Sequence, residues 1–229
     1  MKIKTIFSTL LLGLIVTTTS CTKDNYDAPE STLMGRIVYK GEPLQLRGTS
    51  EAIQLQLYQD GYEKHDPINV FVGQDGVYSA KLFDGEYKMV TRDHNGPWVN
   101  SRDTTIIQVK GNTTHDVEVT PFYTISNADI SLAGNTVKAN FTINKAGTKI
   151  DRIILLMNTT NFVDDVWHNI LRADDADRES VWNAEGAYSM EQDLTNNDAF
   201  QKAKTVFARV CVWSSGADQG IYSPVVRLK

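Results

Sequence analysis

Cysteine is scarce in this sequence: 229 residues contain only two, Cys21 and Cys211. Two cysteines are too few for a disulfide framework, so packing and hydrogen bonds have to hold the fold. Basic residues are also in the minority, with 23 Lys and Arg against 28 Asp and Glu and a net charge of −5. The chain therefore lacks the positive surface that nucleic-acid binding needs, which excludes nucleic acid as a partner.

Signatures of catalysis and metal binding are missing as well. The four histidines are scattered, and the sequence has no H-E-x-x-H, no G-x-S-x-G, no C-x-x-C and no glycine-rich phosphate loop. We therefore predict no enzyme activity, no catalytic residue, no metal and no cofactor. A hydrolase acting through a carboxylate pair stays open as an alternative, because two such groups can meet from distant positions in the sequence.

The first twenty residues, MKIKTIFSTLLLGLIVTTTS, contain two lysines, an apolar run and then small hydroxylated residues. This pattern predicts a signal peptide over residues 1–20, because it is shorter than the about 20 apolar residues of a spanning helix. The small residues before Cys21 resemble a bacterial lipobox, which implies that Cys21 is lipidated and becomes the mature N-terminus. Removing Lys2 and Lys4 leaves 21 basic against 28 acidic residues and a net charge of −7, so membrane contact is expected through the lipid anchor only.

Residues 21–30 are polar and contain a proline, which is typical of a flexible tether. The acidic residues after the lipid cysteine resemble the export signal of Bacteroidetes surface lipoproteins. The resemblance implies an outer-membrane lipoprotein that faces the cell exterior.

Apolar residues recur with period 2 from Leu33 onward, and turn residues arrive every eight to twelve positions. This pattern is typical of an all-β sandwich, so we predict two tandem β-sandwich domains, over residues 31–120 and 121–229. Strands are expected at 34–39, 53–58, 68–72, 77–81, 87–91, 104–109, 114–119, 136–143, 151–157, 188–193 and 206–213. Asn197 is expected to cap one short helix that ends at Lys204. The halves are expected to pack closely around residues 120–122.

Three strings in the first half carry a family resemblance: GRIVYKGEPL at 35–44, QDGVY at 74–78 and FDGEY at 83–87. They resemble the strands and turns of transthyretin-like (prealbumin-like) and carboxypeptidase-regulatory-like domains. Such motifs specify a fold and carry no chemistry.

The end of the chain resembles the last two strands of a fibronectin type III or related immunoglobulin-like sandwich, through FARV at 207–210 and GIYSPVV at 220–226. It lacks a tyrosine in the penultimate strand and an early core tryptophan, so immunoglobulin-like is the better description. Together with the lipobox, the two halves resemble a Bacteroidetes lipoprotein family of unknown function, encoded beside starch-utilisation-type glycan import systems. This resemblance implies glycan or glycan-importer components as partners.

The tryptophans are the main candidates for a ligand site. A sugar packs the C–H groups of one ring face on an exposed aromatic plate, and its hydroxyls need polar neighbours. Trp98 follows a Gly-Pro turn beside Asn95, while Trp167, His168 and Trp182 lie in segment 158–186, which is expected to be irregular and functional. We predict the ligand-binding residues Asn95, Trp98, Trp167, His168 and Trp182. The alternative is that these indoles pack in a core, or that the Trp98 loop plugs one end of its own sandwich or caps the seam between the domains.

Three other features are weaker. Asp174, Asp175 and Asp177 offer oxygen ligands for calcium, but they lack the spacing of a known calcium loop, and a solvated loop is the preferred interpretation. Asp103-Thr104-Thr105 resembles the O-glycosylation acceptor of Bacteroidetes exported proteins, which would place Thr104 on the surface. Cys211 is expected to be a partly shielded residue on the strand face opposite the core.

Two functions follow from these patterns. The first is a non-catalytic surface lipoprotein that binds glycan or assists a glycan importer, which requires at least two of Trp98, Trp167 and Trp182 to be exposed on a common groove. The second is a structural or adaptor lipoprotein that binds a protein partner, which requires buried tryptophans and an apolar patch larger than about 400 Å².

Overall fold

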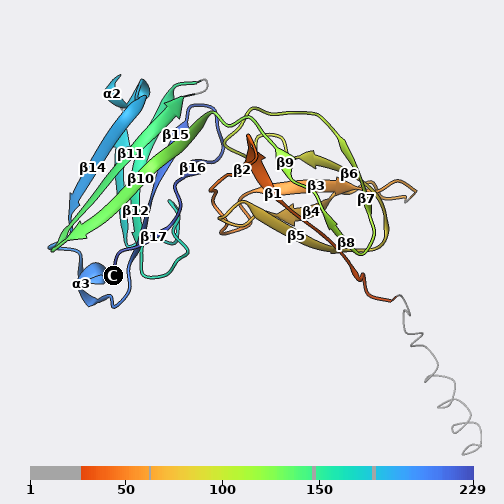
Figure 1. The fold of residues 1–229 in the computed structure, drawn as a ribbon, viewed down its shortest axis with the longest axis horizontal. Helices are drawn as coiled ribbons and strands as arrows, with labels where there is room; N and C mark the ends of the chain where they lie inside the picture. The colour runs from red at the N-terminus through yellow and green to blue at the C-terminus, as the bar shows by residue number, and fades with distance from the viewer. Residues whose placement is uncertain (1–26, 62, 146–147, 177–178) are drawn as a thin grey trace, which may run out of the picture.

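The computed structural model describes residues 27–61, 63–145, 148–176 and 179–229, which form an all-β protein with two halves side by side (Figure 1). The predicted signal peptide, and Cys21 with most of the predicted tether, lie outside the described residues. Within the described ranges no helix has the length and apolar character to cross a bilayer.

Two sheets build the first half. One has the order β2-β1-β5, and β8 and β9 also pair with β1 in parallel, while the other has the order β4-β3-β6-β7. The strands are β1 (Ser31–Tyr39), β2 (Glu42–Pro43), β3 (Gln54–Tyr58), β4 (Ile68–Phe71), β5 (Val77–Leu82), β6 (Gly85–Thr91), β7 (Thr105–Val109), β8 (Asn112–Thr114) and β9 (Val117–Glu118). Alternation explains how they pack: in β3, Leu55 and Leu57 are fully buried, whereas the glutamines beside them are half-buried on the other face.

Two further sheets build the second half, with the orders β10-β11-β14 and β13-β12-β15-β16, and β17 also pairs with β15. The strands are β10 (Tyr123–Ala133), β11 (Thr136–Lys145), β12 (Ile150–Asn158), β13 (Leu171–Ala176), β14 (Gly186–Asp193), β15 (Phe207–Ser214), β16 (Ile221–Tyr222) and β17 (Val226–Arg227). The predicted two-domain, all-β organisation is thus confirmed, with mostly antiparallel pairing.

Two short helices complete the described second half, α2 (Glu179–Trp182) and α3 (Asp198–Lys202). The predicted cap on α3 is confirmed, because the Asn197 side chain accepts a hydrogen bond from the Phe200 amide at 2.9 Å. The helix ends at Lys202 and not at Lys204. The prediction that segment 158–186 is irregular throughout was wrong: it contains β13 and α2, and residues 159–170 form the loop between β12 and β13.

Strands β12 and β15 are buried on both faces. The expectation that one face of β15 turns away from the core was therefore wrong, since Arg209 and Cys211 on that face are both completely buried. Cys211 belongs to a second apolar cluster with Ile154, Leu156, Val163 and Tyr222. Val163 comes from loop 159–170, so this loop covers the strand face that a simple two-sheet arrangement would leave open to water.

The two halves meet in two places. Near the predicted contact at residues 120–122, the Phe122 amide donates a backbone hydrogen bond to the Pro97 carbonyl at 3.1 Å. The second contact was not expected: the Tyr222 amide donates to the Gln45 carbonyl at 3.0 Å, which joins β16 to the first half. Loop 159–170 lies beside this second contact, because its Val163 belongs to the same buried cluster as Tyr222.

Candidate ligand-binding loop at the domain junction

Loop 159–170 connects β12 to β13 and carries three exposed apolar side chains. Trp167 is 77% exposed, Phe162 is 51% exposed and Val166 is 41% exposed. Trp167 has the largest exposed fraction of any large hydrophobic side chain in the described part of the chain. An indole that is bare to this degree is unusual for a side chain of its size, and a ligand can cover it.

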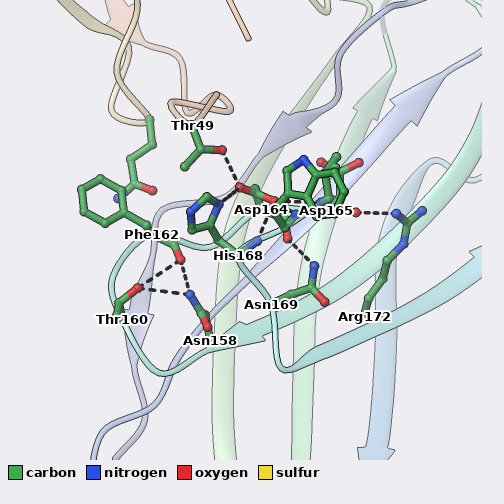
Figure 2. Close-up of polar contacts among 12 residues, drawn as sticks. Thr49, Asn158, Thr160, Phe162, Asp164, Asp165, His168, Asn169 and Arg172 are labelled. Atoms are coloured by element: carbon green, nitrogen blue, oxygen red, sulfur yellow. Dashed lines mark hydrogen bonds and ion pairs between the residues drawn. The ribbon is translucent and has the colours of Figure 1, made fainter. Parts of the chain in front are cut away.

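The backbone around Trp167 is fixed by one buried carboxylate. Oδ1 of Asp164 accepts hydrogen bonds from the amides of Val166 at 2.8 Å, Trp167 at 2.7 Å and His168 at 3.1 Å (Figure 2). Three consecutive amides bound to one oxygen hold the backbone in a tight turn. The exposed indole therefore stands on a rigid base.

The second oxygen of Asp164 reaches across the domain junction. It accepts hydrogen bonds from the Thr49 hydroxyl of the first half and from Nδ1 of His168, the latter at 2.6 Å (Figure 2). Burial would by itself raise the pKa of Asp164, but the hydrogen bonds from Thr49 and from the loop amides outweigh it and lower the pKa below its usual range. Asp164 is thus ionised near neutral pH and ties the loop to the first half.

Further side chains hold the rest of the loop. Nδ2 of Asn169 donates to the Asp164 carbonyl at 3.0 Å, and Nδ2 of Asn158 donates to the Phe162 carbonyl at 2.6 Å (Figure 2). Arg172 on β13 donates to the carbonyl of Asp165. These bonds satisfy the backbone of an irregular segment, so its shape exists before any ligand arrives.

Beneath the loop lies a buried arginine, Arg209, which no motif in the sequence predicted as a site residue. Arg209 is completely buried, its Nη1 donates to the Leu46 carbonyl of the first half at 3.0 Å, and its Nε and Nη2 have no partner among the described groups. Burial lowers the pKa of Arg209, whereas the nearby charges of Asp164 and Asp165 favour its ionised form. The available signal was a lone arginine in an otherwise apolar strand, FARVCVW.

The two candidates from the first half, Trp98 and Asn95, both support the fold and are not available to a ligand as predicted. Trp98 is only 3% exposed, so the prediction that its indole forms an exposed plate was wrong. Trp98 forms an isolated antiparallel β-bridge with Pro121, which agrees with the alternative that this loop caps the seam between the domains. The Asn95 side chain accepts from the Gln54 amide at 2.7 Å and donates to the Ala52 carbonyl at 2.8 Å, so it fastens the loop to the start of β3.

Trp182 does not join Trp167. It lies on α2, is half-buried and has the Lys149 ammonium 3.3 Å from its ring centroid. Trp182 comes after the last residue of β13, Ala176, which pairs with Arg152. Trp167 comes before the first residue of β13, Leu171, which pairs with Met157 at the other end of the strand. The ends of this strand are about 17 Å apart at the usual rise per residue. The expected common groove of two or three tryptophans was therefore wrong, and Trp167 with His168 remains as the candidate site.

The acidic candidates lie partly on a strand and not in a solvated loop, which corrects that expectation. Asp174 and Asp175 are successive residues of β13 and therefore point to opposite faces. Asp174 pairs with Arg172 and Asp175 accepts from the Tyr188 hydroxyl, while Asp177 lies outside the described residues. Among the described side chains no group of three or more His, Cys, Asp or Glu could hold a metal ion. Thr104 is exposed just before β7.

Comparison with known proteins covers both halves. The family model "Protein of unknown function (DUF3823) N-terminal domain" matches residues 31–120, and the model "Domain of unknown function (DUF3823_C)" matches residues 123–227. A DUF3823 family protein from Parabacteroides merdae is 53% identical, with a TM-score of 0.82 over 89% of this chain and 100% of that one. A DUF3823 family protein from Bacteroides ovatus is 30% identical, with a TM-score of 0.74 over 86% of this chain and 98% of that one.

A more distant structure, from Bacteroides uniformis, is described as "a putative carbohydrate binding protein". It is 19% identical, with a TM-score of 0.74 over 88% of this chain and 99% of that one, and so it shares the fold. No curated protein matches the chain.

Proposed function

Since this chain belongs to the DUF3823 family, we propose that it is a non-catalytic cell-surface lipoprotein that binds glycan through loop 159–170. The lipid anchor would be Cys21, in the outer membrane and facing the exterior, and the partners would be a glycan or components of a glycan importer. The sheet orders β10-β11-β14 and β13-β12-β15-β16 support an immunoglobulin-like second half, and the motifs of residues 35–87 support a transthyretin-like first half.

The observation that carries the proposal is the exposed indole of Trp167 on a backbone fixed by Asp164. The apolar face of a sugar ring packs on such an indole, and its hydroxyls can bond to neighbouring polar groups such as the half-exposed His168. Because the loop is already ordered, little conformational entropy is lost on binding. A carbohydrate is also the ligand class named for the B. uniformis structure, which makes it the first class to test.

Affinity electrophoresis in gels that contain starch, xyloglucan or mannan tests this proposal. We expect at least one polysaccharide to retard the protein, and Trp167→Ala to weaken that retardation at least ten-fold. Phe83→Ala is the matched control, because Phe83 is 49% exposed and belongs to the first half. Equal retardation of the wild type and Trp167→Ala, or no retardation of the wild type in any gel, would overturn the proposal.

A second candidate function is an adaptor that binds a protein partner, and the exposure of Phe162, Val166 and Trp167 on one loop favours it. Photo-crosslinking from position 166 in intact outer membranes separates the two functions. A crosslink to one importer component, lost in Trp167→Ala and formed without any polysaccharide binding, would support the adaptor. Polysaccharide binding without such a crosslink would support the glycan-binding function.

A further inference from the structure

The orientation of the His168 ring gives loop 159–170 a specific chemical property. Nδ1 of His168 lies 2.6 Å from Oδ2 of Asp164, and Figure 2 shows the ring turned with this nitrogen toward the carboxylate. The hydrogen bonds that Asp164 accepts hold its pKa below the usual range, so the carboxylate is ionised and can only accept. Nδ1 must therefore carry the hydrogen of this bond.

The other ring nitrogen is left with a free lone pair. A neutral imidazole has one N–H, so a hydrogen on Nδ1 makes Nε2 an acceptor. No hydrogen bond reaches Nε2 from the described part of the chain, and the His168 side chain is 43% exposed whereas Asp164 behind it is fully buried. One residue earlier on the same fixed turn stands the indole of Trp167, which is 77% exposed. The loop thus offers an apolar plate and a hydrogen-bond acceptor next to each other in the sequence.

The charges around the loop disfavour an anionic ligand. The ionised Asp164 lies directly behind the His168 ring. Two arginines support this region, but neither is free to bind an anion, because Arg172 pairs with Asp174 and Arg209 is completely buried. A carboxylate brought to Nε2 would meet a lone pair and a like charge behind it, whereas a hydroxyl has the hydrogen that Nε2 requires.

We propose that His168 is a specificity-determining residue of the glycan site, and that the site takes neutral glycans through a sugar hydroxyl that donates to Nε2. Asp164 is the positioning residue, because it fixes which ring nitrogen carries the hydrogen. Uronic acids, and sugars in which this hydroxyl is substituted, are bound weakly. The inference rests on the proposed glycan-binding function of loop 159–170 and adds to it the ligand class and the direction of one hydrogen bond.

Nitrogen-15 NMR of the full protein at pH 8.5, above the range in which histidines usually change charge, locates the hydrogen without any ligand. We expect His168 to carry it on Nδ1 in the wild type and on Nε2 in Asp164→Asn, because an asparagine amide can donate to Nδ1. His94 is the internal control: its Nδ1 lies 3.3 Å from Nδ2 of Asn100, so its hydrogen is expected on Nε2. A hydrogen on Nε2 of His168 in the wild type would overturn the inference.

Affinity electrophoresis tests the ligand class, with starch, xyloglucan and mannan as neutral polysaccharides and with polygalacturonate and alginate as uronates. We expect retardation by a neutral polysaccharide only. His168→Ala and Asp164→Asn should each weaken it about two- to ten-fold, which is the effect of one lost hydrogen bond. Thr49→Val is the matched control, because it removes the other side-chain donor to Oδ2 of Asp164 and leaves Nε2 of His168 unchanged. This variant should be retarded like the wild type.

The proposed function and this inference fail in different ways. Equal retardation by uronates and neutral polysaccharides, or wild-type retardation of His168→Ala, would overturn the role of His168 and leave Trp167 as the binding residue. A loss in Thr49→Val as large as that in His168→Ala would also overturn it, because the effect would then come from the support of the loop. No retardation of the wild type in any gel would overturn glycan binding itself, and this inference with it.

Discussion

The guanidinium carbon of Arg209 lies 3.9 Å from the centroid of the Tyr222 ring, and both side chains are buried. The contact places a cation on an aromatic face without water, where the attraction between them is strongest. The Tyr222 hydroxyl donates to Asp165, and Arg209 donates to the Leu46 carbonyl of the first half. The support of loop 159–170 and the contact between the two halves therefore belong to one polar network.

Replacing Arg209 with methionine is expected to destabilise the protein by about 3–5 kcal/mol, because it leaves Asp164 and Asp165 buried without their nearby cation. It also removes the hydrogen bond to Leu46, so we expect one unfolding transition for the wild type and two separate transitions, one for each half, for the variant. Chemical denaturation followed by fluorescence and by circular dichroism measures both effects. Arg227→Met, at an exposed position of β17, is the control. A single transition at the wild-type midpoint would contradict the prediction.

Asp164→Asn should show a stability deficit that depends on pH. The pKa of Asp164 is lowered in the folded protein, so its carboxylate contributes stability at pH values above its unfolded pKa of about 3.9. The contribution decreases as the pH falls below that value, by about 1.4 kcal/mol per pH unit, until the folded pKa is passed. We therefore expect a constant deficit of about 2–3 kcal/mol between pH 5 and 8, which shrinks below about pH 4.

Urea denaturation of wild type and Asp164→Asn from pH 7 to pH 2.5 measures this deficit. Asp193→Asn is a suitable control, because the pKa of Asp193 is also lowered, by the Thr195 hydroxyl and amide, but at an exposed site. A deficit of equal size at every pH would contradict the prediction, because the lost stability would then come from the geometry of the hydrogen bonds and not from the charge of the Asp164 carboxylate.

Alternation and turn residues were sufficient to predict much of the fold. In β3 and β11 every second residue is buried, and Asn197 is a strong cap, so these features depend on neighbours in the sequence. The second core under loop 159–170 could not be predicted this way. Its key contact joins Asp164 to Thr49, residues 115 positions apart, and the sequence of β15 does not show which distant segment will cover its outer face.

The same limit applies to the candidate site. Trp98 and Trp167 both follow turn residues among polar neighbours, and the sequence does not distinguish them. They differ because Trp98 meets Pro121 from the segment between the halves, whereas nothing in the described structure covers Trp167. Exposure depends on which distant segments arrive, and only the three-dimensional structure contains that information.

The two indoles should therefore behave in opposite ways. Trp98→Ala is expected to destabilise the protein by about 3–5 kcal/mol, since it removes a large side chain from the core. Trp167→Ala should change stability by less than about 0.5 kcal/mol and should remove most of the fluorescence that acrylamide quenches. Thermal denaturation and quenching of the two variants test this. Comparable destabilisation by both, or unchanged quenching in Trp167→Ala, would contradict the exposure of these residues.

The last prediction concerns the close approach of β16 to β15. A Cβ atom added at Gly220 would lie 2.4 Å from Sγ of Cys211 and 2.7 Å from Nε1 of Trp213, so alanine cannot fit without movement. Since both neighbours are packed, we expect Gly220→Ala to cost about 1–3 kcal/mol. Cys211→Ala removes the nearer atom, so Gly220→Ala should cost less stability in the Cys211→Ala variant than in the wild type. Thermal denaturation of the four proteins measures the coupling, and strictly additive losses would show that the thiol is not the group that excludes a side chain at position 220.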